Sequence, residues 1–137
     1  MKVELENRKL EQAANLLFHL ALKGKQSRHR TKFIKLLQAR IEEVEEQRIQ
    51  LAKEHSNLDE EGNPIVKNNK FDIKDLDAFS KDLEELYDEK MVIEGGDYTS
   101  MLKTLKEVLL TCEVEFSGKE AVLYDYLCEQ FEGGENE

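Results

Sequence analysis

Apolar residues recur three or four positions apart along residues 27–58, and this spacing predicts one long amphipathic helix. The stripe consists of Ile34, Leu37, Ile41, Val44, Leu51 and Leu58, with Arg48 and His55 as polar members of the same register. Such a narrow stripe is typical of a helix that packs against a partner helix. The same spacing returns in a second segment at Leu76, Phe79, Leu83 and Leu86, so we expect the two helices to pack antiparallel.

The segment between these two helices carries the signals of a β-hairpin. Residues 59–74 contain the turn sequences GNP and KNNK, and short β-prone runs stand next to them. Pro64 favours an edge position, because proline has no backbone N–H to donate. We therefore expect residues 27–90 to form a helix, a β-hairpin at its tip and a returning helix that starts at Asp75 or Asp77.

Shorter periodic segments lie on either side of this unit. Residues 1–6 alternate apolar and polar side chains, which predicts a strand, and the strand-like residues 91–96 are suited to pair with it. A first helix is expected to run from an Asn7 cap to about Leu22 and to end at Gly24, with Ser27 placed to cap the long helix. A pair of helices is expected within residues 98–131, with a capping box at Ser117 and Glu120, followed by a frayed tail at 132–137.

These elements predict an α+β fold that is mainly α, in one domain spanning residues 1–137. A long antiparallel helical hairpin with a small β-hairpin at its tip is combined with a short N-terminal strand and a C-terminal helix pair. A chain of 137 residues is large enough for one modest core. No apolar run approaches the roughly 20 residues of a membrane helix, and no leader pattern is present, so we expect a cytosolic protein with no membrane partner.

The net charge of -10 is unevenly distributed along the chain. Residues 1–57 hold 12 Lys+Arg against 8 Asp+Glu, whereas residues 58–137 hold 8 against 22. The basic candidates for partner binding surround the turn expected at residues 23–27 and are Lys23, Lys25, Arg28, Arg30 and Lys32. Three interpretations stay open for them: a contact with acidic residues of this or another chain, a solvated face, or a nucleic-acid site. Nucleic acid is the least expected, because the molecule is acidic overall and only Phe33 offers an aromatic ring nearby.

Carboxylates gather on the two helices of the expected hairpin. The acidic candidates for partner binding are Glu42, Glu43, Glu45, Glu46, Glu84, Glu85 and Asp88, with Asp82 and Glu89 beside them. Such a surface could occupy the basic channel of a protein that normally holds nucleic acid, since charge complementarity speeds association. The alternative is a solvated face that only keeps the protein soluble.

No residue pattern indicates catalysis. The chain has no Walker loop, no GxGxxG, no HExxH and no arrangement typical of a nucleophilic triad. We therefore expect no enzymatic activity, no catalytic residues, no metal and no cofactor. His19 has no second ligand spaced to join it, so a hydrogen-bonded, partly buried imidazole is expected rather than a metal ligand or general base. Cys112 and Cys128 lack CxxC spacing and are expected to be reduced and at least half buried, with a disulfide as the alternative in an oxidising compartment.

Several stretches of the sequence carry a family resemblance. These are MKVELENRKLEQAANLL, LKGKQSRHRTKF, DEEGNPIV with FDIKD after it, and FSGKEAVLYDYL. They resemble a small family of uncharacterised proteins, labelled a domain of unknown function, that tailed phages and prophages of Gram-positive bacteria encode. The most family-like combination is Gly24, Lys25, Ser27, Arg28, Arg30, Thr31 and Lys32. The resemblance implies a phage or prophage origin and an intracellular setting, and it brings no catalytic residues.

The expected function is that of a non-enzymatic phage accessory protein that binds another protein of the host or the phage. The preferred form is an inhibitor of a host defence or nucleic-acid-handling protein in the host cytosol. The alternative is a virion structural or assembly protein, such as a tail adaptor or scaffold, that forms homo-oligomers through the helical stripe and strand edges. A weaker alternative is a regulator that binds nucleic acid through residues 23–35.

Overall fold

Two short antiparallel strands tie the first residues of the chain to its middle. The computed structural model describes residues 1–133, and in it β1 (Lys2–Glu6) pairs with β4 (Lys90–Glu94), with Val3 opposite Ile93. Alternation along the strands buries Val3, Leu5 and Ile93 and leaves the polar positions on the other face. The pairing predicted between the N-terminal strand and the strand after residue 90 is confirmed.

Helices complete the part of the molecule that holds the main hydrophobic core. They are α1 (Leu10–Phe18), the N-terminal half of α2 (Gly24–Glu54), α4 (Thr99–Leu110) and α5 (Gly118–Gly133), joined in part by the 3-10 turns η1 (Asn7–Lys9) and η2 (Gly96–Tyr98). The largest fully buried side chains of this core are Phe33, Phe131, Leu5, Leu10, Leu17, Leu37, Met101, Leu102, Leu105, Leu109 and Leu127. The fold is thus α+β and mainly helical, as the sequence predicts.

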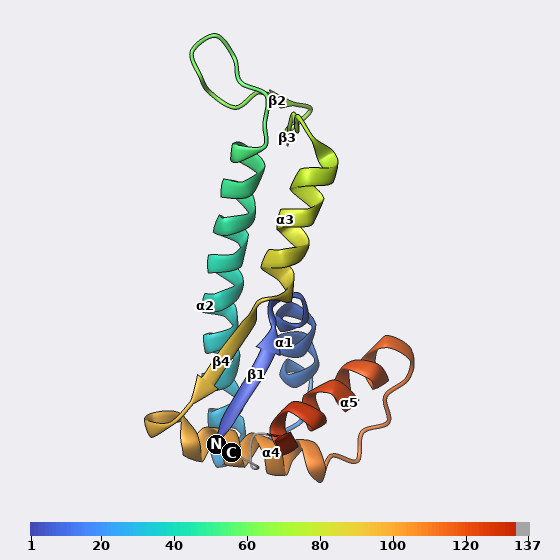
Figure 1. Cartoon of the computed structure of the whole chain (residues 1–137). Helices are drawn as coiled ribbons and strands as arrows, with labels where there is room; N and C mark the ends of the chain where they lie inside the picture. The colour runs from blue at the N-terminus through green and yellow to red at the C-terminus, as the bar shows by residue number, and fades with distance from the viewer. Residues whose placement is uncertain (134–137) are drawn as a thin grey trace.

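A two-helix projection extends from this core (Figure 1). The C-terminal half of α2 runs beside α3 (Leu76–Asp88), and the short strands β2 (Val66–Lys67) and β3 (Lys70–Phe71) lie at the far end. Asn68 and Asn69 form the turn between these strands with φ of 52° and 64°, values that asparagine tolerates better than most residues. We call residues 42–89 the arm and the other described residues the base.

The long apolar stripe has two sets of partners. Ile34 and Leu37 are buried in the base, whose core also contains α1 and α4. Only the later positions of the stripe, such as Leu51, face α3. Ala52 and Leu86 are the buried apolar residues of the arm, so the two helices of the arm share only a small hydrophobic contact.

Several predicted boundaries are wrong. The first helix ends at Phe18 instead of Leu22, and α2 starts at Gly24 instead of Ser27, because Gly24 adopts a φ of 60° that turns the chain into the new helix. The helix ends at Glu54, so Leu58 belongs to the following loop, where its side chain is 58% exposed.

The second helix of the arm shows one prediction confirmed and one that is wrong. Asp75 caps α3 as expected, since its carboxylate accepts a hydrogen bond from the N–H of Ala78 at 3.1 Å. Leu76 was expected in the packed stripe, but it is the first residue of α3 and its side chain is 67% exposed. At the C-terminus, α5 includes Glu132 and Gly133, which were expected in a frayed tail, and residues 134–137 of that tail lie outside the described residues.

Candidate interaction surfaces

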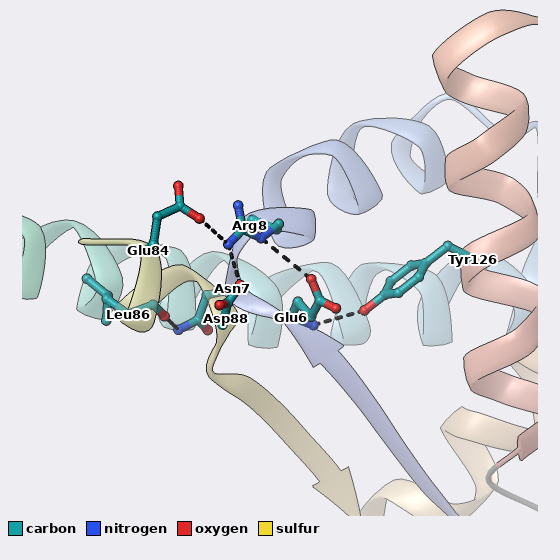
Figure 2. Close-up of polar contacts among 7 residues, drawn as sticks. All are labelled: Glu6, Asn7, Arg8, Glu84, Leu86, Asp88 and Tyr126. Atoms are coloured by element: carbon teal, nitrogen blue, oxygen red, sulfur yellow. Dashed lines mark hydrogen bonds and ion pairs between the residues drawn. The ribbon is translucent and has the colours of Figure 1, made fainter. Parts of the chain in front are cut away.

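The root of the arm is fixed by one buried asparagine (Figure 2). The Asn7 side-chain amide donates to the carbonyl of Leu86 at 2.8 Å, and its oxygen accepts from Arg40 Nε at 3.0 Å. The backbone N–H of Asn7 donates to the carbonyl of Glu89 at 2.8 Å. Asn7 was expected to cap the first helix, but its side chain instead connects α2, α3 and the base.

Arg8 holds two of the predicted partner-binding carboxylates (Figure 2). Its guanidinium donates to Glu84 at 3.0 Å and to Asp88, and Glu6 lies 3.6 Å from its Nε. Hydrogen bonds to Asp88 and Glu84 raise the pKa of Arg8 above its usual value. The two carboxylates are therefore partly neutralised by the base, although each exposed ion pair contributes at most about 1 kcal/mol to stability.

The other predicted carboxylates of the arm divide into paired and free groups. Arg48 donates to Glu45 at 2.5 and 2.9 Å, and these hydrogen bonds lower the pKa of Glu45. Glu43 lies 3.9 Å from Arg40. Among the residues that the structure describes, Glu42, Glu46 and Glu85 form no ion pair, and all three are exposed.

A shallow groove separates the two helices of the arm. Its volume is about 450 Å³, and it is lined by Gln47, Gln50, Leu51, Asp82, Glu85, Leu86 and Glu89. Asp82 Oδ2 lies within hydrogen-bond distance of His55 Nε2, at 2.6 Å, and this contact joins the end of α2 to α3. The groove is thus acidic and amide-rich along a helical edge of the arm.

The five basic residues predicted as a binding surface differ in their contacts. Lys23, Lys25 and Arg28 are exposed. Arg30 instead donates from Nη1 to the carbonyls of Leu17 at 2.9 Å and Leu20 at 2.6 Å, with Phe18 at 3.4 Å. The Leu17 and Phe18 carbonyls lie at the C-terminal end of α1, and the Leu20 carbonyl lies two residues beyond it. Backbone N–H groups of His19 and Leu20 already reach the Leu17 carbonyl, so Arg30 acts as an additional, charged side-chain donor at this helix end.

Lys32 is also engaged by the base. Its Nζ donates to the Asp97 carbonyl at 3.3 Å and lies 5.4 Å from the centroid of the Tyr98 ring. The two contacts join this cation to η2. The family-like basic segment therefore combines Arg30, which binds the carbonyls after α1, with four exposed cations, Lys23, Lys25, Arg28 and Lys32.

Replacing Arg30 by alanine is expected to lower the free energy of unfolding by about 2 kcal/mol, because the α1 carbonyls lose a charged donor. Arg28→Ala, two positions earlier on the same helix and exposed, is expected to change it by less than about 0.5 kcal/mol. Chemical denaturation followed by circular dichroism measures both values. Equal values for the two variants would contradict the capping role.

His29 lies between the basic segment and α4. Its Nδ1 is 2.8 Å from Thr104 Oγ1, and burial lowers its pKa, with Lys25, Arg28 and Lys32 acting in the same direction. The unfolded chain therefore takes up a proton at this side chain before the folded chain does as pH falls through about 6.5.

The free energy of unfolding should consequently be unaffected by His29 above about pH 6.5. It should decrease as the pH falls below that value, until the pH is lower than the lowered pKa of His29 in the folded state. Between pH 7.5 and 5.5, the wild-type chain is expected to lose more thermal stability than His29→Gln, which keeps a polar side chain but has no titrating group. Melting temperatures at the two pH values measure the difference. The same loss in both proteins would assign the effect to other groups.

His19, Cys112 and Cys128 are the remaining polar residues considered from the sequence. His19 is exposed rather than partly buried, and its Nδ1 lies 2.7 Å from the Asn15 carbonyl. Cys112 and Cys128 are free and half-buried, as expected. Within residues 1–133, no three His, Cys, Asp or Glu side chains are grouped so that they could hold a metal ion, and no helix is both long and apolar enough to cross a bilayer.

Sequence reasoning missed Asn7, Arg8 and Arg40 as the residues that position the arm. Asn7 follows a strand pattern directly and is an ordinary helix-cap residue, so its contact with a residue 79 positions away has no local signal. Arg8, the charged partner of Glu84 and Asp88, is likewise far from them in the sequence, so this contact has no local signal either.

A family model described as a protein of unknown function, DUF1617, matches residues 1–137 of this chain. Neither the curated proteins nor the solved structures include a match.

Proposed function

Because this chain belongs to the DUF1617 family, whose function is unknown, we propose its function from its charge and shape. The proposal is a non-enzymatic phage accessory protein that acts in the host cytosol by binding another protein. Its arm is the docking element, and its target is a host defence or nucleic-acid-handling protein with a basic channel.

The position of the net charge is the observation that carries this proposal. The arm, residues 42–89, holds 16 Asp+Glu against 6 Lys+Arg, whereas the rest of the chain holds 14 of each. The entire net charge of -10 therefore belongs to the element that projects from the base (Figure 1). A concentrated charge on a projecting element steers a basic partner to that element and raises the association rate.

The form of the arm supports a channel as the docking surface. Two helices side by side are roughly 20 Å across, and the arm joins the base at one end only. Glu42, Glu46 and Glu85 remain free to pair with cations, while Asn7 and Arg8 fix the root. A positioned arm loses little conformational freedom on binding, which favours affinity.

The test is an affinity capture from lysate of a Gram-positive host, followed by mass spectrometry and by binding of the purified candidate. The proposal expects one host protein that binds nucleic acid, and expects its binding to this chain to compete with DNA or RNA and to weaken as salt increases. A captured protein that binds equally well with its nucleic-acid channel filled would contradict the proposal.

A virion structural or assembly protein is the second candidate, and the apolar residues near the tip of the arm favour it. Leu58, Val66 and Leu76 are each more than half exposed there. Exposed apolar side chains of this kind are typical of protein contacts when they are grouped. Size-exclusion chromatography with light scattering separates the candidates, because a defined ring or large multimer supports assembly and a monomer or dimer supports the inhibitor.

A further inference from the structure

The outer edge of β4 is open for pairing with another strand. The sheet of β1 and β4 has two strands, so each strand has one edge that faces away from the other. The Asn7 N–H donates to the Glu89 carbonyl, which places residues 7 and 89 in a hydrogen-bonded pair that extends the ladder. Hydrogen-bonded pairs alternate along antiparallel strands, so the N–H and C=O groups of Lys90, Val92 and Glu94 point away from β1.

The equivalent edge of β1 is occupied at its Glu6 end. By the same alternation, the backbone groups of Glu6 point away from β4, and the Glu6 N–H donates to the hydroxyl of Tyr126 in α5 at 3.0 Å (Figure 2). Within residues 1–133, no backbone hydrogen bond joins the outward groups of β4 to another element. The two edges of the sheet therefore differ, because α5 occupies the Glu6 end of the β1 edge and no such hydrogen bond occupies the β4 edge within residues 1–133.

We infer that β4 pairs with β4 of a second copy of this chain. The strand reads Lys90-Met91-Val92-Ile93-Glu94, and an antiparallel pair centred on Val92 places Lys90 of each copy opposite Glu94 of the other. The outward backbone groups of Lys90, Val92 and Glu94 are those that a hydrogen-bonded pair in this register requires. The result is a four-stranded antiparallel sheet in the order β1, β4, β4 and β1, closed by a two-fold axis at Val92.

The side chains on the exposed face fit the same register. In each copy Lys2 lies opposite Glu94 and Glu6 lies opposite Lys90. A line of side chains that crosses the four strands of the dimer would then contain Lys2 and Glu94 of one copy followed by Lys90 and Glu6 of the other, so the charges alternate in sign. Opposite charges on neighbouring strands stabilise a sheet, whereas like charges destabilise it.

Val92 occupies the centre of this contact. Its side chain is 49% exposed in the single chain, with exposed Lys90 and Glu94 on the same face. A β-branched residue opposite its own copy is a favourable cross-strand pair. Open edge strands in soluble proteins are often protected by charged side chains, a proline or a bulge. β4 has no proline and pairs with β1 in a continuous register, and its two charged residues, Lys90 and Glu94, are of opposite sign and would lie opposite each other in this dimer.

The first test is the mass of the protein in solution by analytical ultracentrifugation, from about 1 to 100 μM. The expected result is a reversible dimer of the 16.0 kDa chain. Val92→Lys is expected to shift the protein to a monomer, because two ammonium groups would meet at the two-fold axis. Val114→Lys is the matched control, since Val114 is 54% exposed between α4 and α5, and it should leave the dimer unchanged.

A monomer at all concentrations, or a dimer that Val92→Lys leaves intact, would overturn the inference. The second test is Val92→Cys under mild oxidation. Residues of a hydrogen-bonded antiparallel pair have Cα atoms about 5.5 Å apart, a spacing that a disulfide can bridge. Covalent dimers are expected from Val92→Cys and not from Val66→Cys at the tip of the arm, and the opposite pattern would place the contact on the arm.

Discussion

Replacing Glu42, Glu46 and Glu85 by glutamine is expected to weaken binding of the arm to the basic host partner proposed above by about 30-fold. The three carboxylates are exposed and have no ion-pair partner among the described residues, so each is available to a cation of the partner. Three exposed pairs of about 0.7 kcal/mol each account for a loss of about 2 kcal/mol. Glutamine keeps the size and polarity of the side chain, so only the charge changes.

The measurement is titration calorimetry with the captured partner at two salt concentrations. Glu11, Glu107 and Glu129, all exposed on the base, supply the control, because their replacement by glutamine changes the net charge by the same amount. The arm variant should lose affinity and salt dependence, and the control should lose little of either. Equal losses in both variants would mean that net charge matters and the arm does not.

Replacing Phe33 by alanine is expected to lower the free energy of unfolding by about 4 kcal/mol. Phe33 is fully buried in α2, and its ring centroid lies 5.7 Å from that of Phe131 in α5. The substitution removes the ring and leaves a cavity between two helices that are far apart in sequence. Loss of the Phe33–Phe131 contact also weakens the attachment of α5 to the base.

Chemical denaturation measures this loss, with Phe18→Ala as the matched control. Phe18 ends α1 and is 67% exposed, so its replacement should cost less than about 1 kcal/mol. A similar cost for both variants would contradict the placement of Phe33 in the core. Burial of Phe33 also means that its ring is not free to stack on nucleic-acid bases beside the cations of the basic segment.

Periodicity predicted the elements whose signal is local. The alternation at Val3 and Leu5 predicted β1, and the carboxylate of Asp75 predicted the start of α3. The buried positions Ile34 and Leu37 were recognised as apolar, but their spacing does not distinguish packing on α3 from packing on α1 and α4. A stripe specifies that a helix is covered and leaves open which element covers it.

The candidate surfaces were less predictable, because side-chain pairing depends on the fold. Arg28 and Arg30 look alike in the sequence, yet only Arg30 reaches the carbonyls at the end of α1. Glu84 and Glu85 are neighbours on α3, yet only Glu84 meets Arg8. The Arg8–Glu84 contact joins residues 76 positions apart, and the contacts of Arg30 depend on how the chain turns between α1 and α2, so neither has a periodic signature in the sequence.

Because Asn7 binds both helices where the arm meets the base, the arm could be lengthened or shortened without a change in the base. The arm leaves the base along α2 and returns next to its point of departure, where Leu86 and Glu89 bond to Asn7. Seven residues added to each helix within the arm amount to nearly two turns, so the tip would move outward by about 10 Å while both helices keep almost the same facing. On the function proposed above, the length of the arm would therefore set how deep a channel its tip can reach.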